Sequence, residues 1–322
     1  MEPTIAAGVP AGLRATALGL AVDTVTAEVV TAMRDAGLRP LLLKGPSVAL
    51  WLYGDDVPRP YGDSDLLLPP ESQRAAQDVL RALGFRPLGY PVPWESQAWM
   101  RRSDQAAVDL HRSLIGAAAA PARVWEELAT DTETLPVGGV DVEVLGIPAR
   151  ALYAALHAAQ HGAEEQPLED LGRALRIGDE YCWHEAYELA RRLDAVGAFA
   201  TGLRLHPEGA LLAERLDLPA EPPPNVALRA GARVPVASAL EHLRSERSLR
   251  SRVRLLLRAM FPSPLYMRCW SRLQMSGWPA AARSGRIGLW LAYLWRPIWL
   301  LVRAPRAITA VRRAASRSDL GR

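Results

Sequence analysis

The stretch RPYGDSDLLLPPE, residues 59–71, decides how the whole chain is interpreted. Asp63 and Asp65 stand one residue apart, and the three leucines that follow end at two prolines. This pattern predicts a short buried strand, on which alternate side chains point to opposite faces. Asp63 and Asp65 would then share one face, about 7 Å apart, with Leu66 and Leu68 on the other. Two like charges so close repel each other unless a cation lies between them.

A divalent metal ion is the cation that this pattern favours. Mg²⁺ prefers carboxylate oxygen and keeps waters that a substrate phosphate can replace. Asp109, inside the apolar strand pattern AAVDLHRS (106–113), is the candidate third carboxylate, and His111 shares its face. We therefore predict Asp63, Asp65 and Asp109 as catalytic residues and metal ligands. Two Mg²⁺ ions are expected, with Mn²⁺ as the alternative.

A turn upstream of these carboxylates predicts a phosphate site. LLLKGPS (41–47) has the form strand, glycine turn, helix, which offers free backbone N–H groups at a helix N-terminus. Lys44, the only lysine in the chain, can add charge there, beside Gly45 and the hydroxyl of Ser47. Walker A spacing is absent. Arg59 can hold a phosphate bidentately; an exposed loop arginine is the alternative interpretation.

The order of elements predicts an α+β fold. Helical periodicity over residues 14–37 precedes a strand at 41–43, a helix that ends at Gly54, the strand at 63–68 and an amphipathic helix that ends at Gly84. Three further strands follow at FRPLGY, QAWMRR and AAVDLHRS. TLPVGGVDVEVLGIP (134–148) predicts a hairpin with a Gly-Gly turn. Three segments with 3.6-residue periodicity then predict a helical region, and AEPPPNV (220–226) a linker.

The layout LLLKGPSVALWLYG…RPYGDSDLLLP…VDLHRSL resembles the nucleotidyltransferases of the DNA polymerase beta-like superfamily. The nearest resemblance is to a bacterial branch with a KG…DxDLL…DLH layout, and it covers residues 14–115. Departures are the Gly-Pro-Ser turn, Ser64 inside the DxD pair, and Arg112 after His111. The resemblance implies a polymerase-beta-like mixed sheet with flanking helices, then an all-helical domain and a basic helical tail. We place the boundaries at 1–148, 149–220 and 221–322.

The resemblance also implies an activity. A nucleotidyltransferase of this type would move an NMP from an NTP, ATP being expected, to a hydroxyl or phosphate of an acceptor, with release of pyrophosphate. Asp109 would polarise the acceptor hydroxyl, and Lys44 and Ser47 would steady the phosphates. The acceptor is open: a small molecule, a sugar phosphate, a peptide of natural-product or surface-polymer biosynthesis, or a protein or tRNA end. A non-catalytic nucleotide-binding protein or membrane-surface adaptor that retains the fold is the alternative.

Two histidines and an aspartate in the helical region have more than one interpretation. His157 and His161 lie one turn apart, on one helix face, without the HExxH pattern. They can bind zinc, face the cleft together with His111, or pack as ordinary helix residues. The cleft and packing interpretations apply equally to Asp170.

Charge divides the chain in two. Residues 242–322 carry 17 arginines against two acids, net +15, whereas residues 1–241 carry 21 bases and 33 acids, net −12. The apolar run at 288–302 is shorter than the roughly 20 residues that span a bilayer. Residues 242–322 therefore predict contact with an anionic membrane surface or with a protein partner, and nucleic acid is not expected. Two distant cysteines and a non-basic N-terminus predict a cytoplasmic protein, with peripheral membrane association as an extension.

Overall fold

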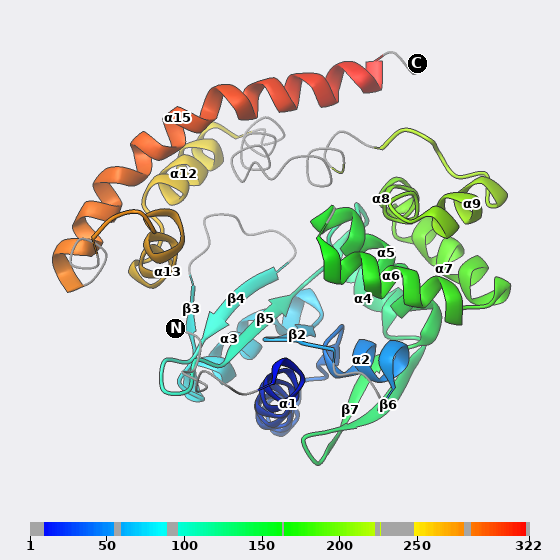
Figure 1. The fold of residues 1–322 in the computed structure, drawn as a ribbon. Helices are drawn as coiled ribbons and strands as arrows, with labels where there is room; N and C mark the ends of the chain where they lie inside the picture. The colour runs from blue at the N-terminus through cyan, green and yellow to red at the C-terminus, as the bar shows by residue number, and fades with distance from the viewer. Residues whose placement is uncertain are drawn as a thin grey trace.

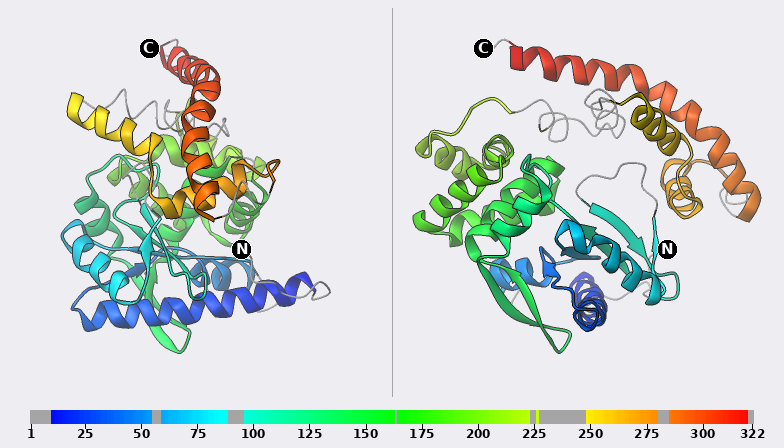
Figure 2. Two further views of the ribbon diagram at one scale, coloured as in Figure 1. Left: turned by 90° about the vertical axis from the view of Figure 1, so that its left-hand side faces the viewer. Right: turned by 180° about the vertical axis from the view of Figure 1, so that it is seen from behind.

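The computed structural model describes residues 10–54, 59–88, 96–162, 164–222, 226, 248–279 and 285–319 (Figures 1 and 2). Seven strands in this part of the chain form one mixed sheet, in the order β3-β4-β5-β2-β1-β7-β6. They are β1 Leu41–Leu42, β2 Ser64–Leu67, β3 Arg86–Pro87, β4 Ser96–Met100, β5 Ala107–His111, β6 Thr132–Val137 and β7 Val140–Leu145. The α+β prediction is confirmed.

Helices cover both faces of the sheet. On one face lie α1 Ala11–Asp35 and α3 Gln73–Ala82, which follows the short 3-10 helix η1 Pro70–Ser72. The other face carries the helical region (green in Figure 1). The helices on that side are α2 Pro46–Tyr53, α4 Pro121–Leu128, α5 Ile147–His161, α6 Glu165–Ile177, α7 Glu180–Arg192, α8 Val196–Leu203 and α9 Pro207–Arg215.

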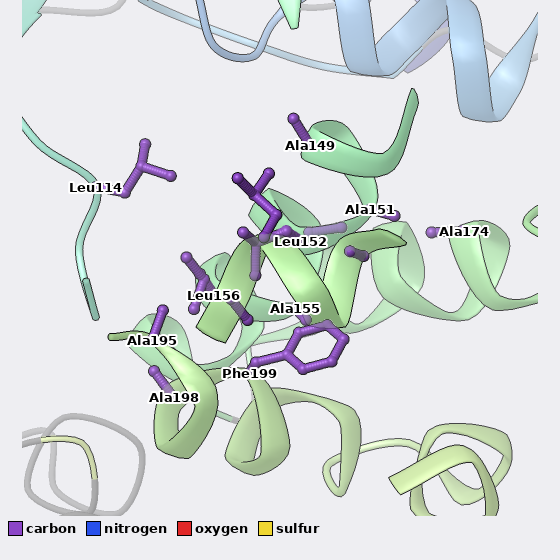
Figure 3. Close-up of a cluster of buried hydrophobic side chains, with 14 of the residues drawn as sticks. Leu114, Ala149, Ala151, Leu152, Ala155, Leu156, Ala174, Ala195, Ala198 and Phe199 are labelled. Atoms are coloured by element: carbon purple, nitrogen blue, oxygen red, sulfur yellow. The ribbon is translucent and has the colours of Figure 1, made fainter. Parts of the chain in front are cut away.

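Strand alternation divides the buried leucines between two cores, as the sequence predicts. Leu66 and Leu68 pack with α1 and α3, whereas Leu67 faces the helical region. The latter core is continuous from the sheet into α5 and α8, and it includes Leu156 and Phe199 (Figure 3). Because the sheet and the helical region share this core, α5 is held directly over the face that carries Asp65. The domain boundaries stay our proposal.

The predicted Gly-Gly hairpin is confirmed as β6 and β7. Gly138 and Gly139 both have positive φ, 57° and 83°, which suits the tight turn of a two-residue hairpin. A Cβ on Gly138 would lie 2.5 Å from the carbonyl oxygen of Asp23, so the hairpin tip packs directly on α1. Glycine is needed there both for its conformation and for the close approach.

Some predicted elements differ in extent from the structure. The helix predicted over 14–37 begins at Ala11 and ends at Asp35, and α4 was not predicted. Among the described residues, the strand predicted at FRPLGY covers Arg86–Pro87, and residues 89–95 lie outside the described part. Residues 223–225 of the predicted 220–226 linker also lie outside it, as do residues 227–247.

The C-terminal helices form an arm above the sheet (Figure 1). They are α12 Leu249–Met260, α13 Pro264–Gln274 and α15 Gly285–Asp319. Met267, Trp270 and Trp299 form its small core. Arg296 is buried there, 5.1 Å from the ring centre of Trp270, and donates from Nε to the carbonyl of Ala259.

One helix in the described part, Gly12–Asp35 within α1, is long and apolar enough to cross a membrane. Val29, Val30 and Met33 on that helix are fully buried in the core beneath the sheet. Such packing is typical of a core helix in a globular domain.

Candidate active site

Asp65 and Asp109 lie side by side on neighbouring strands. β2 and β5 are parallel, and Asp65 pairs in register with Asp109. Both side chains therefore leave the same face of the sheet, the one covered by α5. Asp65 is buried, and Asp63 precedes the first residue of β2 with a side chain that is one-third exposed. The structure thus brings together the three carboxylates that the sequence singled out.

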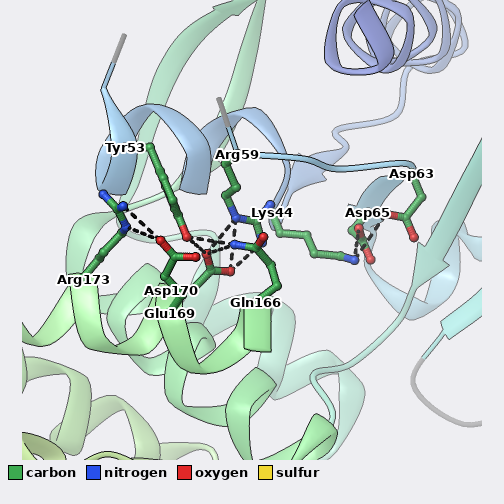
Figure 4. A network of polar contacts seen from close by, with 9 residues as sticks. All are labelled: Lys44, Tyr53, Arg59, Asp63, Asp65, Gln166, Glu169, Asp170 and Arg173. Carbon is green, nitrogen blue, oxygen red and sulfur yellow. Dashed lines mark hydrogen bonds and ion pairs between the residues drawn. The ribbon is translucent and has the colours of Figure 1, made fainter. Parts of the chain in front are cut away.

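Lys44 supplies the cation between the two DxD carboxylates in this structure. Its Nζ lies 3.3 Å from Asp63 Oδ1 and 3.1 Å from Asp65 Oδ2 (Figure 4). Burial lowers the pKa of Lys44, but the attraction of Asp65 and Asp63 outweighs burial, and the net shift is upward. The phosphate contact predicted for Lys44 stays a prediction, because its ammonium group is engaged with the carboxylates here.

The three carboxylates differ in their pKa shifts. Burial raises the pKa of Asp65, but Lys44 and His111 overcome this and hold it below its usual range. Burial and the neighbouring charge of Asp65 raise the pKa of Asp63. The same two causes raise the pKa of Asp109 to about 6. The single positive charge of Lys44 therefore does not balance the three neighbouring carboxyl groups.

His111 joins the cluster from β5. Its Nε2 lies 2.9 Å from Asp65 Oδ1, whereas its buried Nδ1 has no hydrogen-bond partner in the described part of the chain. Ligand atoms of Asp65, Asp109 and His111 all lie within 4.8 Å of one another, a spacing that can hold a metal ion. The sequence placed His111 on the face of Asp109, and the structure adds its contact with Asp65.

Helix α5 presents a row of polar side chains to this cluster. Tyr153, His157 and Gln160 line a small pocket together with His111 and Leu114. The rings of Tyr153 and His157 stack at 5.9 Å. Burial and the charge of Asp65 raise the pKa of Tyr153. Tyr153 was missed by the sequence reasoning, although it stands one turn before His157.

The two helix histidines have different surroundings. Burial and the charge of Lys44 lower the pKa of His157 to about 3, so this ring is neutral at physiological pH. His161 lies 4.5 Å from the His157 ring, and its Nδ1 is 3.2 Å from a carboxylate oxygen of Glu164. The one group suited to a metal among the described residues does not include either histidine. The structure therefore favours the pocket interpretation of His157 over a zinc pair.

Arg59 and Asp170 form a buried ion pair, and the phosphate contact predicted for Arg59 stays a prediction. Arg59 donates from Nε to Asp170 Oδ1 at 2.9 Å and from Nη2 to Oδ2 at 2.6 Å (Figure 4). Tyr53 Oη donates to the same carboxylate at 2.8 Å, and Gln166 at 3.1 Å. Asp170 thereby joins α6 to α2 and to the stretch that precedes β2. Its carboxylate occupies one edge of the Arg59 guanidinium group.

The glycine turn has the conformation that the phosphate prediction needs. Gly45 precedes α2 with φ 78° and ψ −118°, a region that disfavours any residue with a Cβ. Ser47 is fully buried, and its Oγ has no hydrogen-bond partner among the described residues. Tyr61, whose ring lies against Gly45, donates to Asp23 of α1 at 2.9 Å. Tyr61 thus links the turn to α1.

Ser64, a departure from the family pattern, has a partner on the other face. Its Oγ shares a short hydrogen bond with Oγ1 of Thr26 on α1, and Thr26 also lies 2.8 Å from the carbonyl of Val22. The middle residue of the DxD pair therefore ties β2 to α1.

Comparison with solved structures gives distant likenesses only. ANT(2")-Ia in complex with adenylyl-2"-tobramycin is 15% identical, with a TM-score of 0.41 over 53% of this chain and 97% of that one. The lincosamide antibiotic adenylyltransferase LnuA is 12% identical, with a TM-score of 0.34 over 47% and 94%. An antigenic nucleotidyltransferase-like protein from Paracoccidioides brasiliensis is 15% identical, with a TM-score of 0.35 over 56% and 92%.

The family comparison is more extensive. No curated protein matches the chain. The model of a family described as uncharacterised nucleotidyltransferases matches residues 13–208, which include the sheet, the carboxylate cluster and the helical region. The match confirms the resemblance seen in the sequence. This chain therefore belongs to that nucleotidyltransferase family, and it is a nucleotidyltransferase.

Proposed function

We propose that the protein transfers an NMP from an NTP, with ATP as the expected donor, to a hydroxyl or phosphate of an acceptor, and that it releases pyrophosphate. The observation that carries this proposal is the in-register pairing of Asp65 with Asp109, beside Asp63 and beneath α5. Two adjacent acids on buried strands are costly unless a cation is bound there.

The donor set fits Mg²⁺. Three carboxylates face one ammonium group, and burial together with the charge of Asp65 raises the pKa of both Asp63 and Asp109. Carboxylate oxygens are the ligands that Mg²⁺ prefers, so Asp63, Asp65 and Asp109 would hold it, as two ions or with Mn²⁺ in its place. The bound metal would stabilise negative charge on the phosphate oxygens.

Groups of the protein itself would bind the phosphates and accept the proton of the acceptor. The free N–H groups at the start of α2, with Gly45 and the unpartnered hydroxyl of Ser47, would bind the phosphates. Asp109 would accept the proton of the acceptor hydroxyl as the acceptor oxygen bonds to the α-phosphorus and pyrophosphate leaves. A carboxylate with a raised pKa is better suited to this than an ordinary aspartate.

The aromatic side chains that α5 presents beside the cluster are our candidate contacts for the acceptor or nucleobase. Tyr153 and His157 offer stacked rings, and a neutral His157 adds no charge to the site. Flat aromatic faces suit either a base or the ring of a small-molecule acceptor. Synthesis of a natural product or surface polymer in the cytoplasm is the setting that we propose.

Nucleotide-dependent stabilisation tests the proposal. With Mg²⁺ and ATP present at about 100 times Kd, the wild type should gain about 2.7 kcal/mol in unfolding free energy, measured as a rise in Tm. Asp63→Asn should lose this gain, and Asp104→Asn, which changes an exposed carboxylate that pairs with Arg101 outside the cluster, should keep it. Equal gains in wild type and Asp63→Asn would favour the non-catalytic interpretation instead.

A further inference from the structure

Helix α15 is apolar on two opposite faces. Ala292 and Trp299 on its inner face are buried in the arm, with the aliphatic stem of Arg296 between them in sequence. On the outer face, Trp290, Leu294 and Leu301 are 70%, 67% and 72% exposed. The same outer stripe includes Ile287, Ile298 and Ile308. At 100° per residue these positions repeat along one side of the helix. A helix that is apolar on both sides needs a second covering.

Helix α12 also carries an exposed apolar stripe. Leu249, Val253, Leu256 and Leu257 recur at helical spacing and are all exposed. Arg250 and Arg252, also exposed, lie about 80° to either side of this stripe by helical geometry. Arginines that flank an exposed apolar stripe are typical of helices that lie in a membrane interface.

The net charge of the arm indicates which kind of surface covers the two apolar stripes. Residues 242–322 carry net +15, so the symmetric pairing of two such arms would bring two strongly positive surfaces together. A surface that is both apolar and anionic avoids this repulsion. We propose that the outer stripes of α12 and α15 dock on the surface of a bilayer that contains anionic lipids.

The arm lies along the membrane surface rather than crossing it. With 35 residues α15 is about 52 Å long, but its inner face is already occupied by α13, and Arg296 is buried at that contact. Arg286 is exposed beside the stripe, where its long stem can reach phosphate headgroups. Ser263 Oγ donates to the carbonyl of Leu88 at 2.5 Å, which ties the arm to the edge of the sheet. Docking would thus hold the catalytic domain at the membrane.

Cosedimentation of the full chain with vesicles tests the proposal. Binding to phosphatidylcholine vesicles that contain phosphatidylserine should exceed binding to phosphatidylcholine alone by about tenfold or more, and it should fall with added salt. Leu294→Asp with Leu301→Asp should lose this binding. Leu20→Asp with Leu211→Asp, which changes two similarly exposed leucines on α1 and α9, should keep it.

A second variant guards against loss of fold. If the α15 variant fails to give the wild-type circular dichroism melt, Arg250→Glu with Arg286→Glu, which changes two exposed arginines beside the stripes, should still lower binding to the anionic vesicles about tenfold. Wild-type binding without a preference for phosphatidylserine would overturn the proposal. So would an α15 variant that binds vesicles normally but changes a dimer to a monomer in light scattering, since that result would assign the stripe to a second copy.

Discussion

Gly45 shows how much of the proposed phosphate site depends on one residue. Its φ of 78° is disfavoured for any residue with a Cβ, so Gly45→Ala should cost about 1–3 kcal/mol in unfolding free energy and should weaken stabilisation by Mg·ATP. Gly62→Ala, in the same part of the chain but without positive φ or close neighbours, should change stability by less than about 0.5 kcal/mol. Urea unfolding measures both, and equal costs would show that the turn is not under this constraint.

Asp109 predicts a pH dependence of metal binding. Its pKa of about 6 lies above the ordinary value, so the folded metal-free protein holds this proton between about pH 4 and 6, where the unfolded chain has lost it. As the pH falls through this window, protonation of Asp109 stabilises the metal-free fold and competes with Mg²⁺. The rise in Tm caused by Mg²⁺ should therefore diminish below about pH 6.

The control for this prediction removes the titrating group. In Asp109→Asn the response to Mg²⁺ should be weak at every pH, without a midpoint near 6. A wild-type response that is as large at pH 5 as at pH 7.5 would contradict the assignment of Asp109 to the metal site.

At the residue scale, the sequence predicts the strand face on which a side chain lies better than it predicts the distant residue that the side chain contacts. Period-two alternation is a local property, so it placed Asp63 and Asp65 on one face and His111 beside Asp109. The partner of Arg59 lies 111 residues further along the chain, and nothing local to either residue predicts their contact. The pairing of Lys44 with both carboxylates likewise depends on the fold as a whole.

Among the elements, α6 is attached to the catalytic domain through the Arg59–Asp170 pair. Both side chains are nearly fully buried, so Arg59→Met leaves a buried unpaired carboxylate and should cost about 3–5 kcal/mol. Arg59→Met with Asp170→Leu should recover part of that loss. Asp78→Asn, which breaks an exposed pair on α3, should cost less than about 1 kcal/mol. Urea unfolding distinguishes the three, and an Arg59→Met cost as small as that of Asp78→Asn would contradict this attachment.

The same pair predicts how stability changes with acid. Burial raises the pKa of Asp170, but Arg59 outweighs burial and holds it below its usual range. A carboxyl with a lowered folded pKa stabilises the fold above its unfolded value, about 3.9, and this contribution is lost as the pH falls further. The difference between wild type and the double variant should therefore shrink below about pH 4.

At this scale the sequence predicts which elements exist better than how they pair. The glycine turn, the DxD strand and the hairpin carry strong local signals, and all three are present. The parallel pairing of β2 with β5 joins strands that are separated by two others in the chain, so no turn chemistry indicates it. Helix α4, PARVWEEL, has Ala120 at its N-cap instead of a residue whose side chain caps a helix, so no start signal marks it in the sequence.

The whole molecule combines an acidic catalytic body with a basic arm, and the account of the body depends on phosphorus chemistry at Asp65. The most direct test follows label from α-³²P-ATP and γ-³²P-ATP into acceptors of a cell extract, with Mg²⁺ present. We predict that the wild type incorporates the α label and releases pyrophosphate. Asp65→Asn should lower incorporation by at least about 10²-fold, comparable to the loss of one group that stabilises developing charge, and Asp104→Asn should not. Incorporation of the γ label instead, or equal α-label transfer by Asp65→Asn, would contradict the account.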